Sequence, residues 1–391
     1  MFFNNKLSSD LRFALNNGMT SLERIIVHFK FESKPLLEQI SKNKIKILYF
    51  FPRINLICLK ADAKIINALL EFPQVDYMFF DEIGEINPLI SIDSGKNFKY
   101  IKSPLTGKGI SVGIVSTGIH PHDDLVKPIN RIYYFLDLIN SFSFPYDDNG
   151  QGSFLAGIIS SSGCSSEDAV KGVASDSNIC MVKAFDKMGK GYFSTVLWAM
   201  VKLLSLSNEY NMKVILLPFE FKSTNPIIFK SFEAIIEKLN KKNIIVVSAQ
   251  STINAGPSLP SSIEKCICIS SINNSKNFLR GYKKPYIKPD FYLYGENYVS
   301  LCTNEFFIPE RNGKKIYSKR IKDKYRSYTG NSCAAAYTAG LIARLKQEIP
   351  DLNYKDVHGL LRLNSEKITD PLKYGYGVIT SLRINNLSTK E

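Results

Sequence analysis

The sequence contains few of the residues that build metal sites, and it has no segment long enough to cross a membrane. Only four of its 391 residues are histidines, and no two of its seven cysteines are spaced as a C-x-x-C pair. Cys266 and Cys268 alternate with isoleucines, as on one face of a strand. No run of about 18 apolar residues occurs. We therefore predict no metal centre, reduced thiols and no transmembrane helix.

The first residues, MFFNNKLSSDLRFALNNGMT, do not resemble a secretory signal. They lack a basic segment followed by an uninterrupted apolar core, and no small-residue cleavage site follows. We therefore expect a cytoplasmic protein, with a spore compartment as the alternative.

Charge is unevenly distributed, with 50 Lys and Arg against 36 Asp and Glu. Basic residues concentrate between Lys276 and Lys288 and again between Arg311 and Arg326, with tyrosines interleaved. Solvated loops explain this pattern. The alternative is a patch for a polyanion or another acidic partner, formed by Lys314, Lys315, Lys319 and Arg320. No nucleic-acid-binding motif accompanies it, so we do not expect nucleic acid as the partner.

Two fold patterns follow one another along the chain. After an N-terminal extension (1–22), residues 23–82 alternate as β-α-β-β-α-β, which is typical of a small ferredoxin-like unit. A polar connector (83–108) comes next. Residues 109–391 then alternate apolar strands with helices, which predicts an α/β fold with a doubly wound, mainly parallel sheet covered by helices on both faces.

Seven segments of the second part resemble, in order, the motifs of subtilases, the subtilisin-like S8 serine peptidases. GISVGIVSTGIHPHDDL resembles the aspartate segment V-x-D-S/T-G-I/V, and DDNGQGSFLAGII resembles the histidine segment D-x-x-G-H-G-T-H-V-A-G. KGVASDSNICMVKAFDKMGKG, IIVVSAQST and KPDFYLYGENYVS follow. GNSCAAAYTAG resembles the serine segment G-T-S-M-A, and YGYGVI ends the series. The resemblance implies a subtilisin-like fold, with residues 23–82 as an inhibitor-type prodomain.

The same resemblance implies that most of the catalytic groups are missing. Ser332 keeps the serine position, whereas Ser116 occupies the aspartate position and Phe154 is assigned to the histidine position, after Gln151. Thr252 occupies the position of the asparagine that stabilises the oxyanion. A phenyl ring cannot accept a proton, so Phe154 removes the general base that a serine nucleophile needs. We expect Ser332 to cap its helix instead.

The substrate groove departs from the family pattern as well. Pro218 and Glu220 flank Phe219 where the family has serine and glycine, and Ser251 replaces a further glycine. Proline removes a backbone donor from the groove edge and Glu220 adds a bulky charge, so we expect impaired peptide binding. His120, His122 and Asp123 are the candidates for a substitute base, although the family fold leads their turn away from the serine. His28 and His358 are expected to be structural.

These observations favour a catalytically inactive subtilase homologue that retains its prodomain docked in cis and acts by binding. Inactive members of this family in spore-forming bacteria act in germination signalling, so another protein, such as an active protease or signalling partner, is the expected partner. The alternatives are an active S8 endopeptidase with a non-standard base and a basic adaptor for a polyanion. No cofactor is predicted. Calcium stays open, because many subtilases bind it and Asp147-Asp148-Asn149 alone does not define a site.

Overall fold

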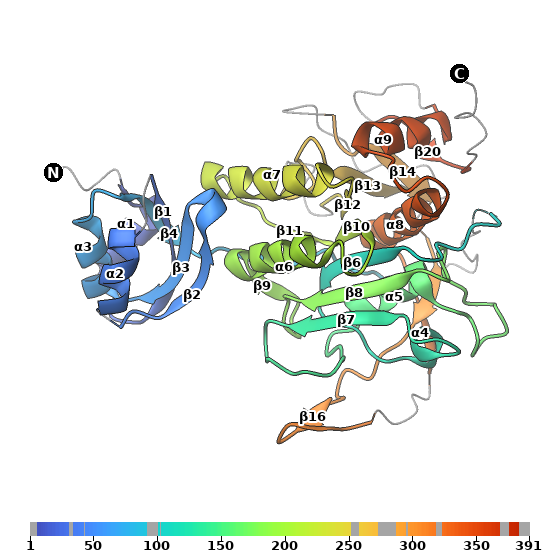
Figure 1. The fold of residues 1–391 in the computed structure, drawn as a ribbon, viewed down its shortest axis with the longest axis horizontal. Helices are drawn as coiled ribbons and strands as arrows, with labels where there is room; N and C mark the ends of the chain where they lie inside the picture. The colour runs from blue at the N-terminus through green and yellow to red at the C-terminus, as the bar shows by residue number, and fades with distance from the viewer. Residues whose placement is uncertain are drawn as a thin grey trace.

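The computed structural model describes residues 6–30, 34–42, 44–91, 101, 103–251, 258–272, 287–294, 296–317, 323–367 and 375–382. These residues form a large α/β body and a smaller N-terminal unit beside it (Figure 1).

A nine-stranded sheet forms the centre of the large body. The strand order is β19-β20-β14-β13-β12-β10-β6-β8-β7, and every pair is parallel except β19–β20. The strands are β6 (Ser111–Ser116), β7 (Ile132–Asp137), β8 (Asn178–Lys183), β10 (Met212–Leu217), β12 (Ile245–Ala249), β13 (Ile267–Ile272), β14 (Phe291–Tyr294), β19 (Ser365–Glu366) and β20 (Val378–Ile379). Strands buried on both faces are rich in apolar residues, as the IVV that opens β12 illustrates.

Helices cover both faces of this sheet (Figure 1). One face packs against α6 (Phe193–Leu206) and α7 (Pro226–Asn240), and the other against α5 (Gln151–Ser160), α8 (Asn331–Glu348) and α9 (Tyr354–Leu363). The short helix α4 (Asp123–Val126) lies beside α5. Small side chains allow α8 to approach the strands closely, since Ala334, Ala335 and Ala336 are fully buried. The predicted doubly wound α/β fold is therefore confirmed.

The N-terminal unit is a four-stranded antiparallel sheet in the order β2-β3-β1-β4. Its elements are α1 (Ser9–Asn16), β1 (Glu23–Phe29), α2 (Lys34–Lys42), β2 (Ile47–Phe51), the 3-10 turn Pro52–Ile54, β3 (Leu56–Ala61), α3 (Ala63–Leu70) and β4 (Val75–Phe80). This is the expected ferredoxin-like α+β arrangement. Leu11 of α1 is buried in the same core as the unit's helices and strands.

One sheet face of the N-terminal unit packs on α6. Tyr49 and Phe51 contact Trp198, with ring centroids 5.7 and 5.9 Å away. Asp81 receives hydrogen bonds at the start of α6 from the Ser194 backbone N–H (2.9 Å) and hydroxyl (2.7 Å), and it pairs with Arg24 at 2.8 Å. A buried carboxylate at a helix N-terminus is favoured by the helix dipole and the free N–H groups there.

Seven short strands of the described chain lie outside the two larger sheets. They are β5 (Ile83–Ile86), β9 (Lys190–Tyr192), β11 (Phe219–Glu220), β15 (Tyr298–Leu301), β16 (Glu310–Arg311), β17 (Lys314–Lys315) and β18 (Tyr325–Tyr328). β5 lies between β11 and β9 in a three-stranded sheet, β15 pairs with β18, and β16 pairs with β17 in a hairpin that projects from the body (Figure 1). None of the described helices is long and apolar enough to cross a membrane.

Candidate functional site

Ser332 lies near the start of α8 and is completely buried. Among the described residues its hydroxyl makes one hydrogen bond, a long one of 3.5 Å to the carbonyl oxygen of Asn87. Gly330 occupies the N-cap position of α8, where no side chain caps the helix. The expectation that Ser332 caps its helix is therefore wrong, because the side chain points to the connector instead.

Gln151, the first residue of α5, stands between Ser332 and Ser116. Its amide nitrogen donates to the Asn87 carbonyl oxygen at 2.5 Å, and its amide oxygen accepts a 3.4 Å hydrogen bond from the Ser116 hydroxyl. The neutral side chains of Gln151 and Ser332 thus meet at the Asn87 carbonyl, and the neutral side chain of Ser116 is joined to them through Gln151. None of them is basic at neutral pH.

The assignment of the histidine position to Phe154 is wrong in this structure. Phe154 lies one turn further along α5, 1% exposed, with its ring centroid 4.9 Å from that of Tyr328 in an edge-on contact. The motif contains two histidine positions three residues apart, and the sequence alone did not show which one faces the serine. Gln151 is the residue that the structure places there.

No described imidazole or carboxylate forms a hydrogen bond with Ser332. The ring of His120 packs edge-on against Phe307 at 5.4 Å, and burial lowers the pKa of His120 to about 4. His122 caps α4 by accepting from the Asp124 N–H and bonds the Lys324 carbonyl, while Asp123 pairs with Lys127.

The two remaining histidines lie elsewhere. His28 pairs with Asp76 in the N-terminal unit, and His358 of α9 lies 3.3 Å from Asp290. Each of the four histidines therefore contacts groups other than Ser332.

The connector passes through the groove as an extended strand. β5 pairs antiparallel with β11 on one side (Phe219 with Ile86) and with β9 on the other (Gly84 with Gly191). The Asn87 N–H then donates to the Pro218 carbonyl at 3.1 Å, and Ile90 exchanges two backbone hydrogen bonds with Thr329. The Asn87–Pro88 peptide bond therefore lies directly at Ser332, with chain bound in the groove on both sides.

The altered groove residues still support this pairing. Pro218 has no N–H, but its carbonyl accepts the hydrogen bond from Asn87, so the expected loss of peptide binding does not extend to the connector. Glu220 is 4% exposed and lies 3.5 Å from the Lys222 ammonium. Ser251 is buried. Thr252, the predicted oxyanion residue, lies outside the described residues.

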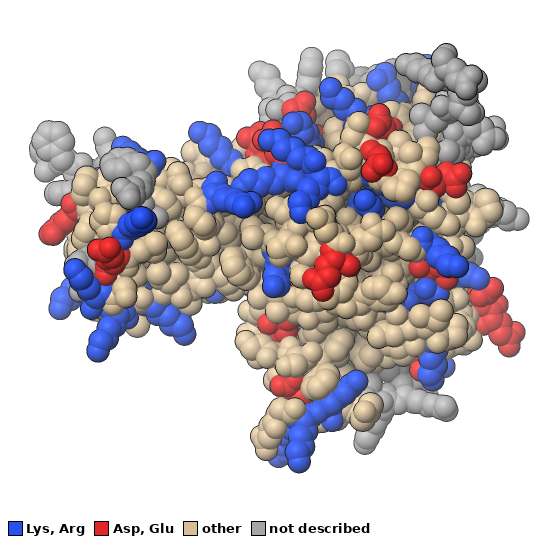
Figure 2. Space-filling model, viewed as in Figure 1, with Lys and Arg blue, Asp and Glu red and all other residues tan. Residues whose placement is uncertain are grey.

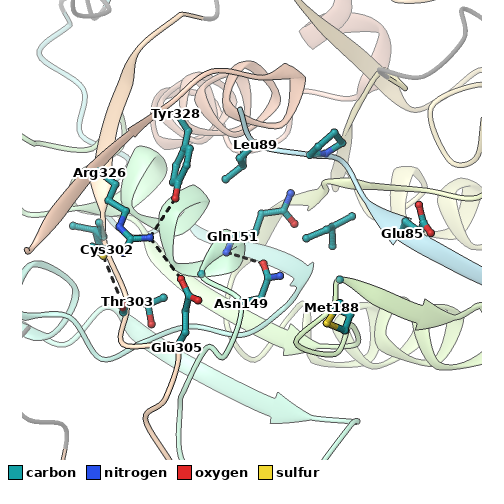
Figure 3. Close-up of a pocket in the computed structure, with 15 residues that line it drawn as sticks. Glu85, Leu89, Asn149, Gln151, Met188, Cys302, Thr303, Glu305, Arg326 and Tyr328 are labelled. Atoms are coloured by element: carbon teal, nitrogen blue, oxygen red, sulfur yellow. Dashed lines mark hydrogen bonds and ion pairs between the residues drawn. The ribbon is translucent and has the colours of Figure 1, made fainter. Parts of the chain in front are cut away.

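A cavity of about 420 Å³ opens beside Gln151 (Figure 3). The connector forms one wall through Glu85 and Leu89. The other wall is formed by Arg326 and Tyr328 of β18 and by Cys302, the residue after β15. An ion pair of 3.6 Å between Arg326 and Glu305 lies at its margin. Sequence reasoning missed Asn87 and this cavity, because both depend on where the connector lies in space.

The other predicted residues lie away from this site. Lys314 and Lys315 form β17 of the projecting hairpin, and both are exposed. Lys319 and Arg320 lie outside the described residues. Asp147 accepts hydrogen bonds from Thr117, Gly150 and Ser153, so its carboxylate stabilises the loop that precedes α5. No cluster of metal-binding side chains occurs within the described part of the chain.

Comparison with known proteins finds relatives that are similar in sequence and in fold. Residues 107–377 match the model of the subtilase family. Serine protease AprX of Bacillus subtilis is 30% identical over 312 residues, covering 71% of this chain and 66% of AprX. Minor extracellular protease Epr of the same organism is 25% identical, covering 71% of this chain but 39% of Epr. The chain thus spans less than two thirds of either relative.

Two solved structures share the fold. Epidermin leader peptide processing serine protease (EpiP) of Staphylococcus aureus superimposes with a TM-score of 0.71 at 16% identity, covering 95% of this chain and all of that chain. Fervidolysin of Fervidobacterium pennivorans gives 0.69 at 15% identity, covering 94% and 62%. The ordered motifs, the parallel sheet and the matched family model together show that this chain belongs to the subtilase family.

Proposed function

We propose that this chain is a subtilase pseudoprotease that acts by binding. The observation that carries this proposal is the position of Gln151. It occupies the place between Ser116 and Ser332 where a serine protease needs a general base, and an amide cannot accept the serine proton.

The expected loss of rate is large. Removing the histidine of a serine-protease triad lowers kcat by about 10⁶-fold. Here the aspartate position is also changed, to Ser116, whose hydroxyl would not stabilise an imidazolium as a carboxylate does. Burial further raises the pKa of the adjacent Cys333 thiol, so that residue does not offer a thiolate as a substitute nucleophile.

The connector provides a second reason to expect inactivity. Asn87 is completely buried, and its carbonyl is held by Gln151 while β5 is hydrogen-bonded on both sides. The next residue is Pro88, so the nitrogen of the Asn87–Pro88 peptide bond carries no hydrogen and cannot donate a hydrogen bond. The N-terminal unit would then act as a retained, prodomain-like unit docked in cis, and the cleft would stay closed.

The partner is proposed to be another protein, an active protease or a component of a signalling system such as spore germination. The curated relatives are named as proteases, which supports the fold and not this role. Because the connector fills the cleft, we expect the partner to bind another surface of the protein.

Labelling with a fluorophosphonate tests the proposal. Because the connector covers Ser332, the experiment uses the wild-type chain and a Gly84→Leu variant. A Cβ on Gly84 would lie 2.5 Å from the buried Phe221 ring, so leucine would force β5 out of the groove. Limited proteolysis within residues 83–91 confirms the opening. Gly359→Leu is the control, since no described residue outside its own stretch of α9 comes within 4 Å of a Cβ at that position.

We expect no label on Ser332 in any of the three proteins, and an intact chain by mass spectrometry after prolonged incubation. Each protein is compared with its Ser332→Ala counterpart. Label or cleavage near Asn87 that disappears with Ser332→Ala would show a working hydrolase and overturn the proposal.

A further inference from the structure

A second surface of the molecule has the properties of a binding site. It combines the free edge of β7 with the segment 303–317, here called the arm, which contains the β16–β17 hairpin (Figure 1). We propose that this surface binds an extended, acidic segment of a partner protein, which adds to β7 as a further strand. The inference rests on the proposed binding role and names its surface.

The first observation is the strand edge itself. β7 is the last strand of the nine-stranded sheet, and no described strand pairs with its outer side. The exposed fraction of Tyr133 is 51%, so the strand is open to solvent there. A sheet edge presents alternating N–H and C=O groups that the main chain of an extended peptide can satisfy.

The second observation is a cavity of about 610 Å³ between β7 and the arm. Its walls are mostly aromatic and aliphatic, and they include Tyr133, Phe135, Phe144, Phe307 and Ile316. Apolar pockets next to a strand edge can receive alternate side chains of an added strand, which provides sequence preference.

The third observation is the concentration of exposed apolar side chains around this cavity. Three large apolar residues that are exposed in the described structure line it: Tyr133, Ile316 and Tyr317. Three more are sequence neighbours of lining residues: Ile129, Phe306 and Ile308. Phe306 is 92% exposed and Tyr317 79% exposed. Clustered exposed apolar surface is typical of protein–protein contact sites.

The arm is fixed to the body, so this surface is preformed. The Thr303 hydroxyl donates to the Asp147 carbonyl at 3.1 Å, and the Glu310 carboxylate accepts from the Ser143 N–H at 2.8 Å. Phe307 packs on His120. A preformed site loses less conformational entropy when it binds a partner.

Charge identifies the kind of partner. The ammonium of Lys315 lies 5.4 Å from the Phe144 ring centroid and 5.1 Å from that of Tyr317. None of the ion pairs found among the described residues involves Arg311, Lys314 or Lys315. Basic side chains cover the projecting hairpin in Figure 2. An acidic segment complements this surface.

Charge and hydrogen bonding disfavour two other occupants. A second copy of this chain would bring the same basic hairpin against itself, because its net charge is +14. A nucleic acid could stack bases on the aromatic rings, but its phosphodiester backbone has no N–H donors for the strand carbonyls of β7. A peptide satisfies the edge, the apolar cavity and the basic residues together.

An array of short peptides that alternate Asp or Glu with Phe, Tyr, Leu or Ile tests the proposal on the full-length chain. Controls on the array carry Lys in place of the acidic residues or proline at alternate positions. We expect the acidic peptides to bind, and the double variant Lys314→Glu/Lys315→Glu to weaken that binding at least tenfold. The double change Lys230→Glu/Lys241→Glu, which alters the charge equally at two exposed positions of α7 and its C-cap, should leave it unchanged.

Hydrogen exchange locates the bound peptide. We expect slower exchange of β7 amides in the complex and unchanged exchange in β5. The Ser332→Ala variant should bind the peptides as the wild type does. A loss of peptide binding would therefore contradict this inference without bearing on whether Ser332 is catalytically inactive.

Three outcomes of the peptide experiments overturn the inference. They are the absence of binding to any acidic peptide, equal binding by Lys314→Glu/Lys315→Glu and wild type, and protection that omits β7. Preferential binding of a single-stranded oligonucleotide, or a dimer that is lost in the same double variant, assigns the surface to one of the other occupants and overturns it as well.

Discussion

At the scale of single residues, the sequence motifs identified some of the catalytic positions and left one of them ambiguous. Ser116 and Ser332 follow from the motif order alone, and the structure brings them to one place through Gln151. The choice between Gln151 and Phe154 depended on the direction of each side chain from α5. A motif with two histidine positions does not show which of them faces the serine. The structure does, because α5 begins at Gln151 and Phe154 packs against Tyr328.

Restoring the charged groups tests the corrected assignment. In the Gly84→Leu background, Ser116→Asp with Gln151→His should make Ser332 reactive to a fluorophosphonate, because an imidazole would then stand beside the serine hydroxyl. The readout is label that is lost on adding Ser332→Ala.

The comparison protein carries Ser116→Asp with Phe154→His in the same background. It should stay unlabelled, since that imidazole would face Tyr328. Its fold is checked by circular dichroism. Label on this protein and not on the Gln151→His protein would restore the assignment to Phe154.

At the scale of elements, periodicity predicted the long helices and the buried strands well. The alternation of apolar strands and helices expected over residues 109–391 is present in the structure. β5 was taken as part of a linker, because IGEI is short and becomes a strand only through pairing with β9 and β11. Asn87 was missed for the same reason, since long-range pairing and not local sequence brings it to Ser332.

Lys346 of α8 binds the segment that follows α7 and the turn between α8 and α9. We expect it to make the stability of the protein depend on pH. It is completely buried in α8, and its ammonium donates to the carbonyls of Asn243 (2.7 Å), Pro350 (3.1 Å) and Leu352. Burial is the main cause that lowers the pKa of Lys346 to about 8 from 10.5. The folded state therefore disfavours the charged form relative to the unfolded chain.

The sign of the effect follows from linkage. The Lys346 contribution to the free energy of unfolding should rise with pH from about 8 to 10.5, by up to roughly 3 kcal/mol, and stay constant above that range. Urea unfolding at several pH values measures it. Lys346→Met should remove this rise while destabilising the protein at every pH, because three carbonyls lose their donor. An identical pH profile in both proteins would contradict the prediction.

At the scale of the whole molecule, the two parts are joined by a shared apolar core and by polar contacts at the start of α6. The expected β-α-β-β-α-β unit and the parallel α/β body both appear in the structure. How they contact each other could not be predicted, because Arg24, Asp81 and Ser194 are distant in sequence. The sequence therefore predicted the two folds, whereas the side-chain contacts with α6 hold the N-terminal unit on the large body.

Asp81 should control whether the two parts unfold together. Its side chain is fully buried, and it accepts from Arg24, from the Ser194 N–H and from the Ser194 hydroxyl. Asp81→Ala leaves the Arg24 guanidinium and the start of α6 without this acceptor, so we expect a loss of about 3–5 kcal/mol in unfolding free energy. Calorimetry should show one transition for the wild type and two for the variant, with the N-terminal unit melting first.

Asp76→Ala provides the matched control for this prediction. Asp76 is an acidic residue of the same unit, but its carboxylate is one third exposed and pairs with His28 and Lys30 rather than with α6. We expect a change of about 1 kcal/mol or less and a single transition. If Asp81→Ala also melts in one step with an equally small change, the apolar contact of Tyr49 and Phe51 with Trp198 is sufficient to hold the N-terminal unit on the body.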